Sequence, residues 1–155
     1  RSSAASDVYK RQVLDLFAGS GALGLEAASR GAKEVTLVDN SAAAIKVIKD
    51  NARVVPEAKV QVVEAKASSF LAGAPRNHYT MVLADPPYEL TDEAVAEMVE
   101  ALIPVLSNDA VVVVERNSAS PETAWPQGFE PTGQKLKKRT YGIARFDMAI
   151  WRGEG

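Results

Sequence analysis

The chain has 155 residues, enough for one domain with a hydrophobic core, and 46% of them are apolar and 25% charged, as in ordinary globular proteins. No apolar run is long enough to span a membrane, and the net charge of −2 gives no overall attraction to nucleic acid. The chain has no cysteine, and its one histidine, His78, lies in a polar stretch typical of a loop, so we expect a cytoplasmic protein without a metal site.

The order of elements along the chain predicts an α/β fold. Residues 1–12 are polar and patternless, and we expect a leader that precedes a single domain over residues 13–152. In that domain the expected strands are 13–17, 34–39, 59–65, 79–85 and 110–115, and the expected helices are 21–30, 41–54, 67–72 and 91–103. A loop is expected over 117–134, followed by an antiparallel hairpin of 135–141 and 145–151. This alternation is typical of an open parallel sheet with helices on both faces.

A glycine-rich segment joins the first expected strand to the first expected helix. Its sequence, DLFAGSGALG, has the pattern G-x-G-x-x-G at Gly19, Gly21 and Gly24, which permits a tight turn and a close approach of a ligand to the backbone. Asp39 ends the second strand, where its carboxylate can accept hydrogen bonds from a ribose diol. Because Asp15 disfavours a pyrophosphate and favours a cationic ligand, the segment favours S-adenosylmethionine over NAD.

A second motif, LADPPYE, ends the fourth expected strand at the same edge of the sheet. The following proline holds Asp85 extended, and Pro86 and Pro87 carry no N–H, so the loop presents a carboxylate and a carbonyl without competing donors. Tyr88 adds a flat aromatic face. Two acceptors and a ring suit a planar exocyclic amine, which Asp85 and the Pro86 carbonyl can activate for attack on a methyl group. We therefore predict that residues 85–88 form the catalytic loop.

Positive charge gathers near the end of the chain. The segment GQKLKKRTYGIAR has no acidic residue and five cations, which are Lys135, Lys137, Lys138, Arg139 and Arg145. Such cations can bind nucleic-acid phosphates, or they can protect an exposed sheet edge from pairing with other chains. Charge alone leaves both interpretations open.

Together, VLDLFAGSGALGLEAASRGA, VTLVDN and LADPPYE resemble the bacterial 16S ribosomal RNA guanine-N2 methyltransferases of the RsmD type, over nearly the whole chain from Val13 to Trp151. The resemblance implies a Rossmann-like class I methyltransferase fold, with strand order 3-2-1-4-5-7-6 and a mostly parallel sheet that ends in the antiparallel hairpin. It implies S-adenosylmethionine as the methyl donor. The implied acceptor is the N2 amine of a guanine of 16S rRNA in an assembling small ribosomal subunit.

Carried over by position, the resemblance also implies roles for individual residues. The donor site would comprise Asp15, Phe17, Ala18, Gly19, Ser20 and Gly21 at the methionine end, Asp39 at the ribose and Asn40 beside the adenine. The five cations would face RNA. Many relatives have Asn or Asp where this chain has Lys66, which cannot accept a hydrogen bond, so we expect the backbone of Ala67 to contact the adenine. The family's basic N-terminal segment is not seen here, so we expect a truncated form, and we expect a monomer with no membrane partner.

Other interpretations share part of this pattern. An adenine-N6 methyltransferase uses both motifs but normally needs a sizeable target-recognition region, and only about 40 residues follow the fifth expected strand. Protein-glutamine methyltransferases generally have Asn before the prolines, and the chain lacks the Y-x-x-x-K pattern of many dehydrogenases. A domain that binds the donor without catalysing transfer also fits both motifs.

Overall fold

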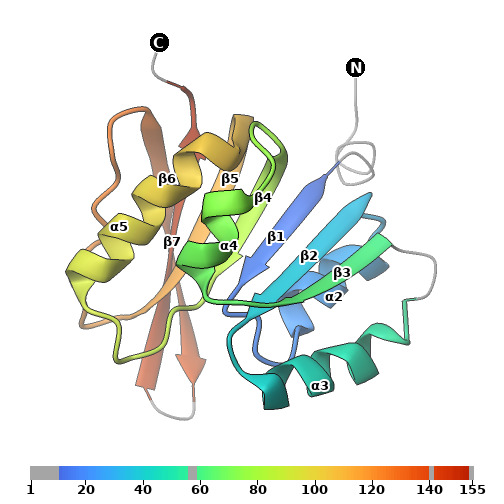
Figure 1. The fold of residues 1–155 in the computed structure, drawn as a ribbon. Coiled ribbons are helices and arrows are strands. Elements are labelled where there is room, and N and C mark those ends of the chain that lie inside the picture. Colours follow the sequence, from blue (N-terminus) through green and yellow to red (C-terminus); the bar gives the residue numbers. More distant parts are fainter. Residues whose placement is uncertain (1–10, 56–58, 140–141, 154–155) are drawn as a thin grey trace.

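The computed structural model describes residues 11–55, 59–139 and 142–153. Its strands are β1 (Gln12–Leu16), β2 (Glu34–Asp39), β3 (Lys59–Glu64), β4 (Tyr79–Ala84), β5 (Leu106–Asn117), β6 (Phe129–Arg139) and β7 (Gly142–Trp151). They form one sheet in the order β3-β2-β1-β4-β5-β7-β6 (Figure 1). Strands β1 to β5 are parallel, and β7 is antiparallel to β5 and β6. The strand order and the mostly parallel sheet expected for a class I methyltransferase fold are confirmed.

Four α-helices of the described residues connect these strands, and each begins and ends within two residues of its expected position. They are α2 (Ala22–Ser29), α3 (Ala42–Ala52), α4 (Ala67–Gly73) and α5 (Asp92–Leu102), and α5 continues into the short 3-10 helix η1 (Ile103–Val105). Hydroxyl side chains start two of them: Ser41 accepts from the N–H of Ala44 at 3.2 Å, and Thr91 accepts from that of Ala94 at 3.1 Å. None of the described helices is long and apolar enough to cross a membrane.

The helices divide the hydrophobic core between the two faces of the sheet. On one face, Leu71 of α4 and Val99 of α5 pack with Val112 of β5. On the other face, Leu25 of α2 and Ile48 of α3 pack with strands β1 and β2. Strands β1 and β2 therefore carry buried apolar residues on both of their faces.

The C-terminal strands differ from the sequence prediction in their limits. Strand β5 begins at Leu106 instead of Ala110, and β6 begins at Phe129, inside the segment expected to be a loop. Residues 117–134 were expected to form a loop because they are rich in Pro, Ser and Gly. Strand β6 pairs only with β7, however, so Pro131, which has no N–H, can lie in it with its nitrogen on the free side. The register shifts between Pro131 and Gly133, which accommodates the proline within the strand.

The turn of the hairpin is also displaced from its expected position. Residues 142–144 were expected to connect the two strands, but they belong to β7 and pair with residues 137–139 of β6. The connection therefore falls on residues 140–141, which lie outside the described residues. The expected leader over residues 1–12 lies mostly outside them too, and Gln12 belongs to β1.

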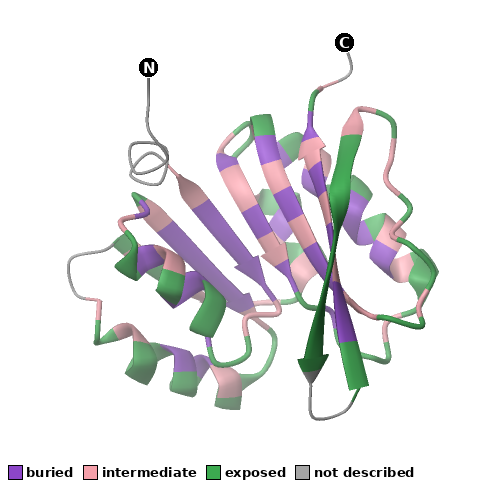
Figure 2. Ribbon diagram, turned by 180° about the vertical axis from the view of Figure 1, so that it is seen from behind, coloured by how far each residue is buried: buried purple, intermediate pink, exposed green. Residues whose placement is uncertain are grey.

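One half of the sheet has an uncovered face. Viewed from behind, α2 and α3 lie over β1, β2 and β3, whereas no described helix lies over β4, β5, β7 and β6 (Figure 2). The residues that alternate onto this face are only half-buried, and they include Met81, Leu83, Val111, Val113, Met148 and Ile150. This half of the sheet therefore has described helices on only one of its faces.

Candidate active site

The two sequence motifs meet at the carboxyl edge of the parallel strands. A cavity of about 880 Å³ opens there, between the ends of β1, β2, β3 and β4 and helices α4 and α5. Among the residues that the sequence assigned to donor binding or catalysis, its walls include Phe17, Asp39, Asn40, Ala67, Asp85 and Pro87. We call this space the donor cavity. Open α/β sheets bind their ligands at this edge.

The glycine loop between β1 and α2 holds an unusual backbone conformation. Phe17, Gly19 and Gly21 have φ angles of 59°, 61° and 80°, in the left-handed region. For Phe17 this region is unfavourable, so the loop must be held by other contacts. The N–H of Ala18 donates to the Val38 carbonyl at 3.0 Å, and the Asn51 side chain donates to the Ser20 carbonyl at 2.9 Å. Strand β2 and helix α3 therefore fix the shape of the loop.

Asp39 links the loop to the next helix. One of its carboxylate oxygens accepts from the N–H of Gly19 at 2.9 Å, and the other accepts from the N–H of Ser41 at 2.9 Å. Each oxygen keeps a lone pair, so the carboxylate can still accept from a diol in the donor cavity that it lines. Asp39 thus has a structural role that its position in the sequence did not indicate.

Asp15 lies beneath the loop and is only 4% exposed. It lines neither of the cavities described here, and its Oδ2 accepts from the N–H of Gly24 at 3.1 Å. Burial raises the pKa of Asp15 to about 7; the Gly24 N–H opposes this shift, and the negative charges of Asp85 and Asp39 add to it. The raised pKa of Asp15 is thus mainly an effect of burial, and the nearby carboxylates of Asp85 and Asp39 contribute a smaller part.

The third glycine of the motif, Gly24, allows helix α2 to pack closely against the sheet. A Cβ at Gly24 would lie 2.3 Å from Leu37 Cδ2 and 3.1 Å from Asp15 Oδ2. Only glycine lets α2 lie this close to β1 and β2. A Cβ at Gly19, in contrast, would have no atom within 4 Å. Gly19 lines neither the donor cavity nor any other cavity described for the structure, so its contact with a ligand stays a prediction.

The loop of residues 85–88 separates the donor cavity from a second, smaller one. This second cavity has a volume of about 300 Å³ and is lined by Asp85, Pro86, Pro87, Tyr88, Glu115, Arg116, Asn117, Ser120 and Ala144. We call it the acceptor-side cavity. Asp85 and Pro87 line both cavities, and Tyr88 is 66% exposed. The loop therefore forms a shared wall between two spaces.

Sequence reasoning missed much of the lining of these cavities. In the donor cavity the missed residues include Ser41, Ser68, Leu71 and Met98, and Lys66, which the sequence marked only as a departure from the family pattern, also lies in the wall. In the acceptor-side cavity they are Glu115, Arg116, Asn117, Ser120 and Ala144. A signal was present for Glu115, because it ends the expected fifth strand at the edge where the other motifs lie. The remaining ones depend on tertiary packing.

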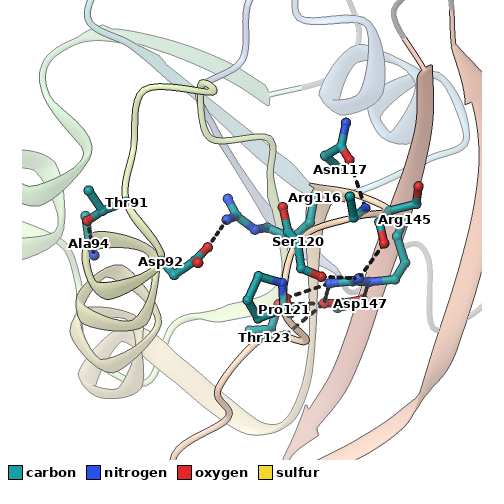
Figure 3. A network of polar contacts seen from close by, with 12 residues as sticks. Thr91, Asp92, Ala94, Arg116, Asn117, Ser120, Pro121, Thr123, Arg145 and Asp147 are labelled. Carbon is teal, nitrogen blue, oxygen red and sulfur yellow. Dashed lines mark hydrogen bonds and ion pairs between the residues drawn. The ribbon is translucent and has the colours of Figure 1, made fainter.

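Arg145 is a correction to the sequence prediction. It was grouped with the RNA-facing cations, yet it is only 6% exposed, and its Nε donates to Asp147 Oδ1 at 2.6 Å (Figure 3). Its other nitrogens donate to the carbonyls of Ser120 at 2.8 Å and Pro121 at 2.9 Å. Arg145 thus holds the segment after β5, which forms part of the acceptor-side cavity.

The pKa values of this pair follow from their contacts. The hydrogen bond to Asp147 raises the pKa of Arg145. Burial raises the pKa of Asp147, but hydrogen bonds from Arg145 and Thr123 outweigh burial, and the pKa lies below its usual value. Both groups are therefore charged at neutral pH, and each depends on the other because both are buried.

Three of the other hairpin cations lie on the surface. Lys135, Lys137 and Lys138 of β6 are exposed, together with Leu136 and Ile143, which are 63% and 47% exposed. The side chain of Arg139 lies outside the described residues. The exposed lysines remain candidates for RNA contact.

His78 lies away from both cavities. It precedes β4, at the amino end of the strands, and its Nε2 lies 2.8 Å from Glu34 Oε2. The sequence interpretation of His78 as a loop residue outside the catalytic machinery agrees with this position.

Comparisons with known proteins show to which family the chain belongs. A protein-family model described as "Conserved hypothetical protein 95" matches residues 2–150. "Putative rRNA methyltransferase YlbH" of Bacillus subtilis strain 168 is 32% identical over 148 residues, which are 92% of this chain and 76% of that protein. "Ribosomal RNA small subunit methyltransferase D" of Escherichia coli K12 is 42% identical over 83 residues, which are 52% of this chain and 40% of the relative. The match therefore spans less than half of that relative's length.

The solved structures agree with this assignment. "Putative methylase HI0767" of Haemophilus influenzae superposes with a TM-score of 0.80 at 25% identity, covering 96% of this chain and 91% of that one. The topology, the two motifs at one sheet edge and the sequence matches point to the same group of proteins. The chain belongs to the family described as Conserved hypothetical protein 95, and it has the fold of an S-adenosylmethionine-dependent methyltransferase.

Proposed function

We propose that this protein transfers a methyl group from S-adenosylmethionine to the exocyclic N2 amine of a guanine in 16S rRNA of the small ribosomal subunit. The observation that carries the proposal is the shared wall: Asp85 and Pro87 line the donor cavity and the acceptor-side cavity at once. A methyl group passing between two substrates must cross such a boundary. The names of relatives that match over most of the chain, which refer to rRNA methylation, support the choice of RNA.

The residues of the donor cavity fit S-adenosylmethionine, which would supply a methyl group activated by a sulfonium. Asp39 lies where it can accept from a ribose diol, as its cavity-lining carboxylate has free lone pairs. The negative charges of Asp39 and Asp85, which both act on Asp15, favour a ligand that brings positive charge. The open side of Gly19 lets a ligand approach the backbone.

The catalytic loop would act on the acceptor amine by hydrogen bonding. Asp85 and the Pro86 carbonyl would accept the two N–H groups of the amine, which turns its lone pair toward the donor cavity and stabilises the positive charge that develops on nitrogen. Pro86 and Pro87 fix the backbone, so these acceptors are held in place before the substrate arrives. Holding the nitrogen in line with the methyl carbon supplies a further part of the rate. Tyr88, exposed beside the acceptor-side cavity, offers its ring for stacking on the base.

The exposed lysines of β6 would guide the RNA to this loop. They lie on the same antiparallel strands that form one side of the acceptor-side cavity, whose wall includes Ala144 of β7. Phosphate contacts of this kind position a nucleic acid without reading its sequence. The guanine would then enter between Tyr88 and the end of β5.

Replacing Asp85 tests this proposal directly. We expect Asp85→Ala to lower methyl transfer to unmethylated small-subunit particles by at least about 100-fold, because a pre-positioned acceptor is lost. Binding of S-adenosylhomocysteine, measured by calorimetry, should change by less than about threefold. Asp50→Ala, which removes an exposed aspartate of α3, is the matched control and should leave both quantities unchanged. An equal loss of transfer and of donor binding would show that Asp85 belongs to the donor site alone.

A further inference from the structure

The end of β5 places two polar side chains in the acceptor-side cavity beside the catalytic loop. Strands β4 and β5 are in register up to the pair Ala84 and Val114. Asp85 directly follows β4, Glu115 is the next residue of β5, and both line the acceptor-side cavity. Asn117 lines it as well, two residues further along β5.

Glu115 places a carboxylate within the protein at this position. It is only 6% exposed although it lies at the end of a strand. A carboxylate offers about four lone-pair sites, so it can accept from a base in the cavity in addition to its contacts within the protein. Burial strengthens such a bond because water does not compete for it.

The amide of Asn117 is oriented by the loop that follows it. Its Oδ1 accepts from the N–H of Ala119 at 2.8 Å, so its nitrogen is turned away from this contact (Figure 3). That nitrogen can only donate. The loop itself is held by Arg145 through the carbonyls of Ser120 and Pro121. The donor on Asn117 is therefore held in one orientation.

We propose that Glu115 and Asn117 select guanine, with Glu115 accepting from the N1–H and Asn117 donating to O6; this inference rests on the proposed function. The edge of guanine carries the N2 amine, the N1–H and O6 in sequence, and these match Asp85, Glu115 and Asn117 in the order acceptor, acceptor, donor. Adenine carries an acceptor at N1 beside its N6 amine, so Glu115 would repel it. The catalytic loop hydrogen-bonds only to the reacting amine. Glu115 and Asn117 contact N1 and O6, and so they distinguish guanine-N2 from adenine-N6 methylation.

A modified base can test the selection without changing the reacting amine. In 2,6-diaminopurine the N2 amine is kept, while N1 becomes an acceptor and a second amine replaces O6. Small-subunit particles would be assembled with rRNA that carries either guanosine or 2,6-diaminopurine riboside at the methylated position, introduced by ligation. Because both bases have the N2 amine, kcat/KM can be measured for both. The ratio of the two values reports selection and is insensitive to a general loss of activity.

We expect the wild-type protein to prefer guanosine by about 10- to 100-fold, the effect of one well-formed contact pair to a base. Glu115→Gln can donate to N1, so the preference should fall at least about 10-fold, and the double variant Glu115→Gln, Asn117→Asp should prefer 2,6-diaminopurine. Glu100→Gln, which removes an exposed carboxylate of α5, should keep the wild-type ratio. Binding of S-adenosylhomocysteine should be unchanged in all variants.

The outcomes separate the two proposals. Equal rates of the wild-type protein on both bases, or a Glu115→Gln ratio within about twofold of the wild-type ratio, would overturn the role of Glu115 and Asn117 while leaving guanine methylation intact. Wild-type methylation of a nucleotide other than guanine would overturn the proposed function, and this inference with it.

Discussion

The two ends of the candidate site are built in different ways. At the donor end, the glycine loop and Asp39 contact residues of the adjacent β1, β2 and α3 elements, and short motifs in the sequence marked them. At the acceptor end, the wall is held by contacts between distant segments. Arg145 of β7 bonds the segment after β5, and Arg116 of β5 pairs with Asp92 of α5 at 2.6 Å.

This difference shows which parts of a site a single sequence reveals. A tight turn around a ligand needs glycines at fixed spacing. The donor end can therefore be recognised from a short sequence motif. A cavity wall held by an arginine that bonds the carbonyls of a distant segment needs only that the partners meet in the fold. Arg145 therefore looked like one more exposed cation of a basic segment, although it is a buried structural residue.

The largest effect on stability is expected from removing Arg145, which holds the segment that lines the acceptor-side cavity. Arg145→Ala leaves the carboxylate of Asp147 buried without its cation, and we expect a loss of about 3–5 kcal/mol in the free energy of unfolding. Arg152→Ala is the control, because the ion pairs of Arg152 with Asp109 and Glu130 lie on the surface; it should cost much less than Arg145→Ala. Urea denaturation of both variants measures the difference. Equal losses would mean that Arg145 contributes no more than a surface cation.

At the donor end, the protonation of Asp15 should appear in the pH dependence of stability. The pKa of Asp15 is raised from 3.8 to about 7 in the folded protein, so its favourable contribution is complete below pH 3.8 and is lost as the pH rises through 7. Between these values the free energy of unfolding should fall by about 1.4 kcal/mol per pH unit from this group alone. Asp15→Asn should remove this slope. The variant should also lose the tightening of donor binding that we expect from pH 6 to 8.

Calorimetry with S-adenosylmethionine, which carries the sulfonium charge, and urea denaturation over this pH range measure both effects. If the wild-type and Asp15→Asn proteins show parallel stability curves, Asp15 does not titrate as described. A donor affinity that is independent of pH would remove the link between the negative charge of the site and the ligand.

Substitutions of Gly24 and Gly19 test two different roles within one loop, helix packing and ligand contact. Gly24→Ala places a methyl group against Leu37 and should cost about 1–3 kcal/mol in stability, because the helix must move away from the sheet. Gly19→Ala meets no neighbouring atom, so only its left-handed φ is unfavourable, at a cost of about 1–2 kcal/mol. We expect Gly19→Ala to weaken donor binding more than its stability loss suggests. If only Gly24→Ala weakens binding, Gly19 does not face the donor.

The smallest effect we expect concerns the surface lysines of β6. Replacing Lys137 and Lys138 with Gln should lower the slope of log affinity for RNA against log salt by about 1.5, with little change in stability. Replacing Lys46 and Lys49 of α3, two exposed lysines of another part of the surface, is the control and should leave the slope unchanged. Filter binding at several salt concentrations gives the slopes. An unchanged slope for Lys137 and Lys138 would mean that they only protect the sheet edge.

Most of the fold could be predicted from the sequence, since apolar strands alternate with helices from β1 to α5. The limits of β6 could not, because Pro131 is compatible with a strand only at an edge that pairs on one side. Within the site, the positions of Asp39 and Asp85 at strand ends were predictable. The second role of Asp39, as an acceptor for the N–H groups of Gly19 and Ser41, and the burial of Arg145 depend on tertiary contacts.

The most direct test of the central claim is methyl transfer itself. The 155-residue chain would be incubated with labelled S-adenosylmethionine and unmethylated small-subunit particles, and the nucleosides of the RNA would be separated by chromatography. We predict label in N2-methylguanosine, and its loss with Asp85→Ala. Label in N6-methyladenosine, or no label from a chain that binds S-adenosylhomocysteine, would contradict the proposed activity.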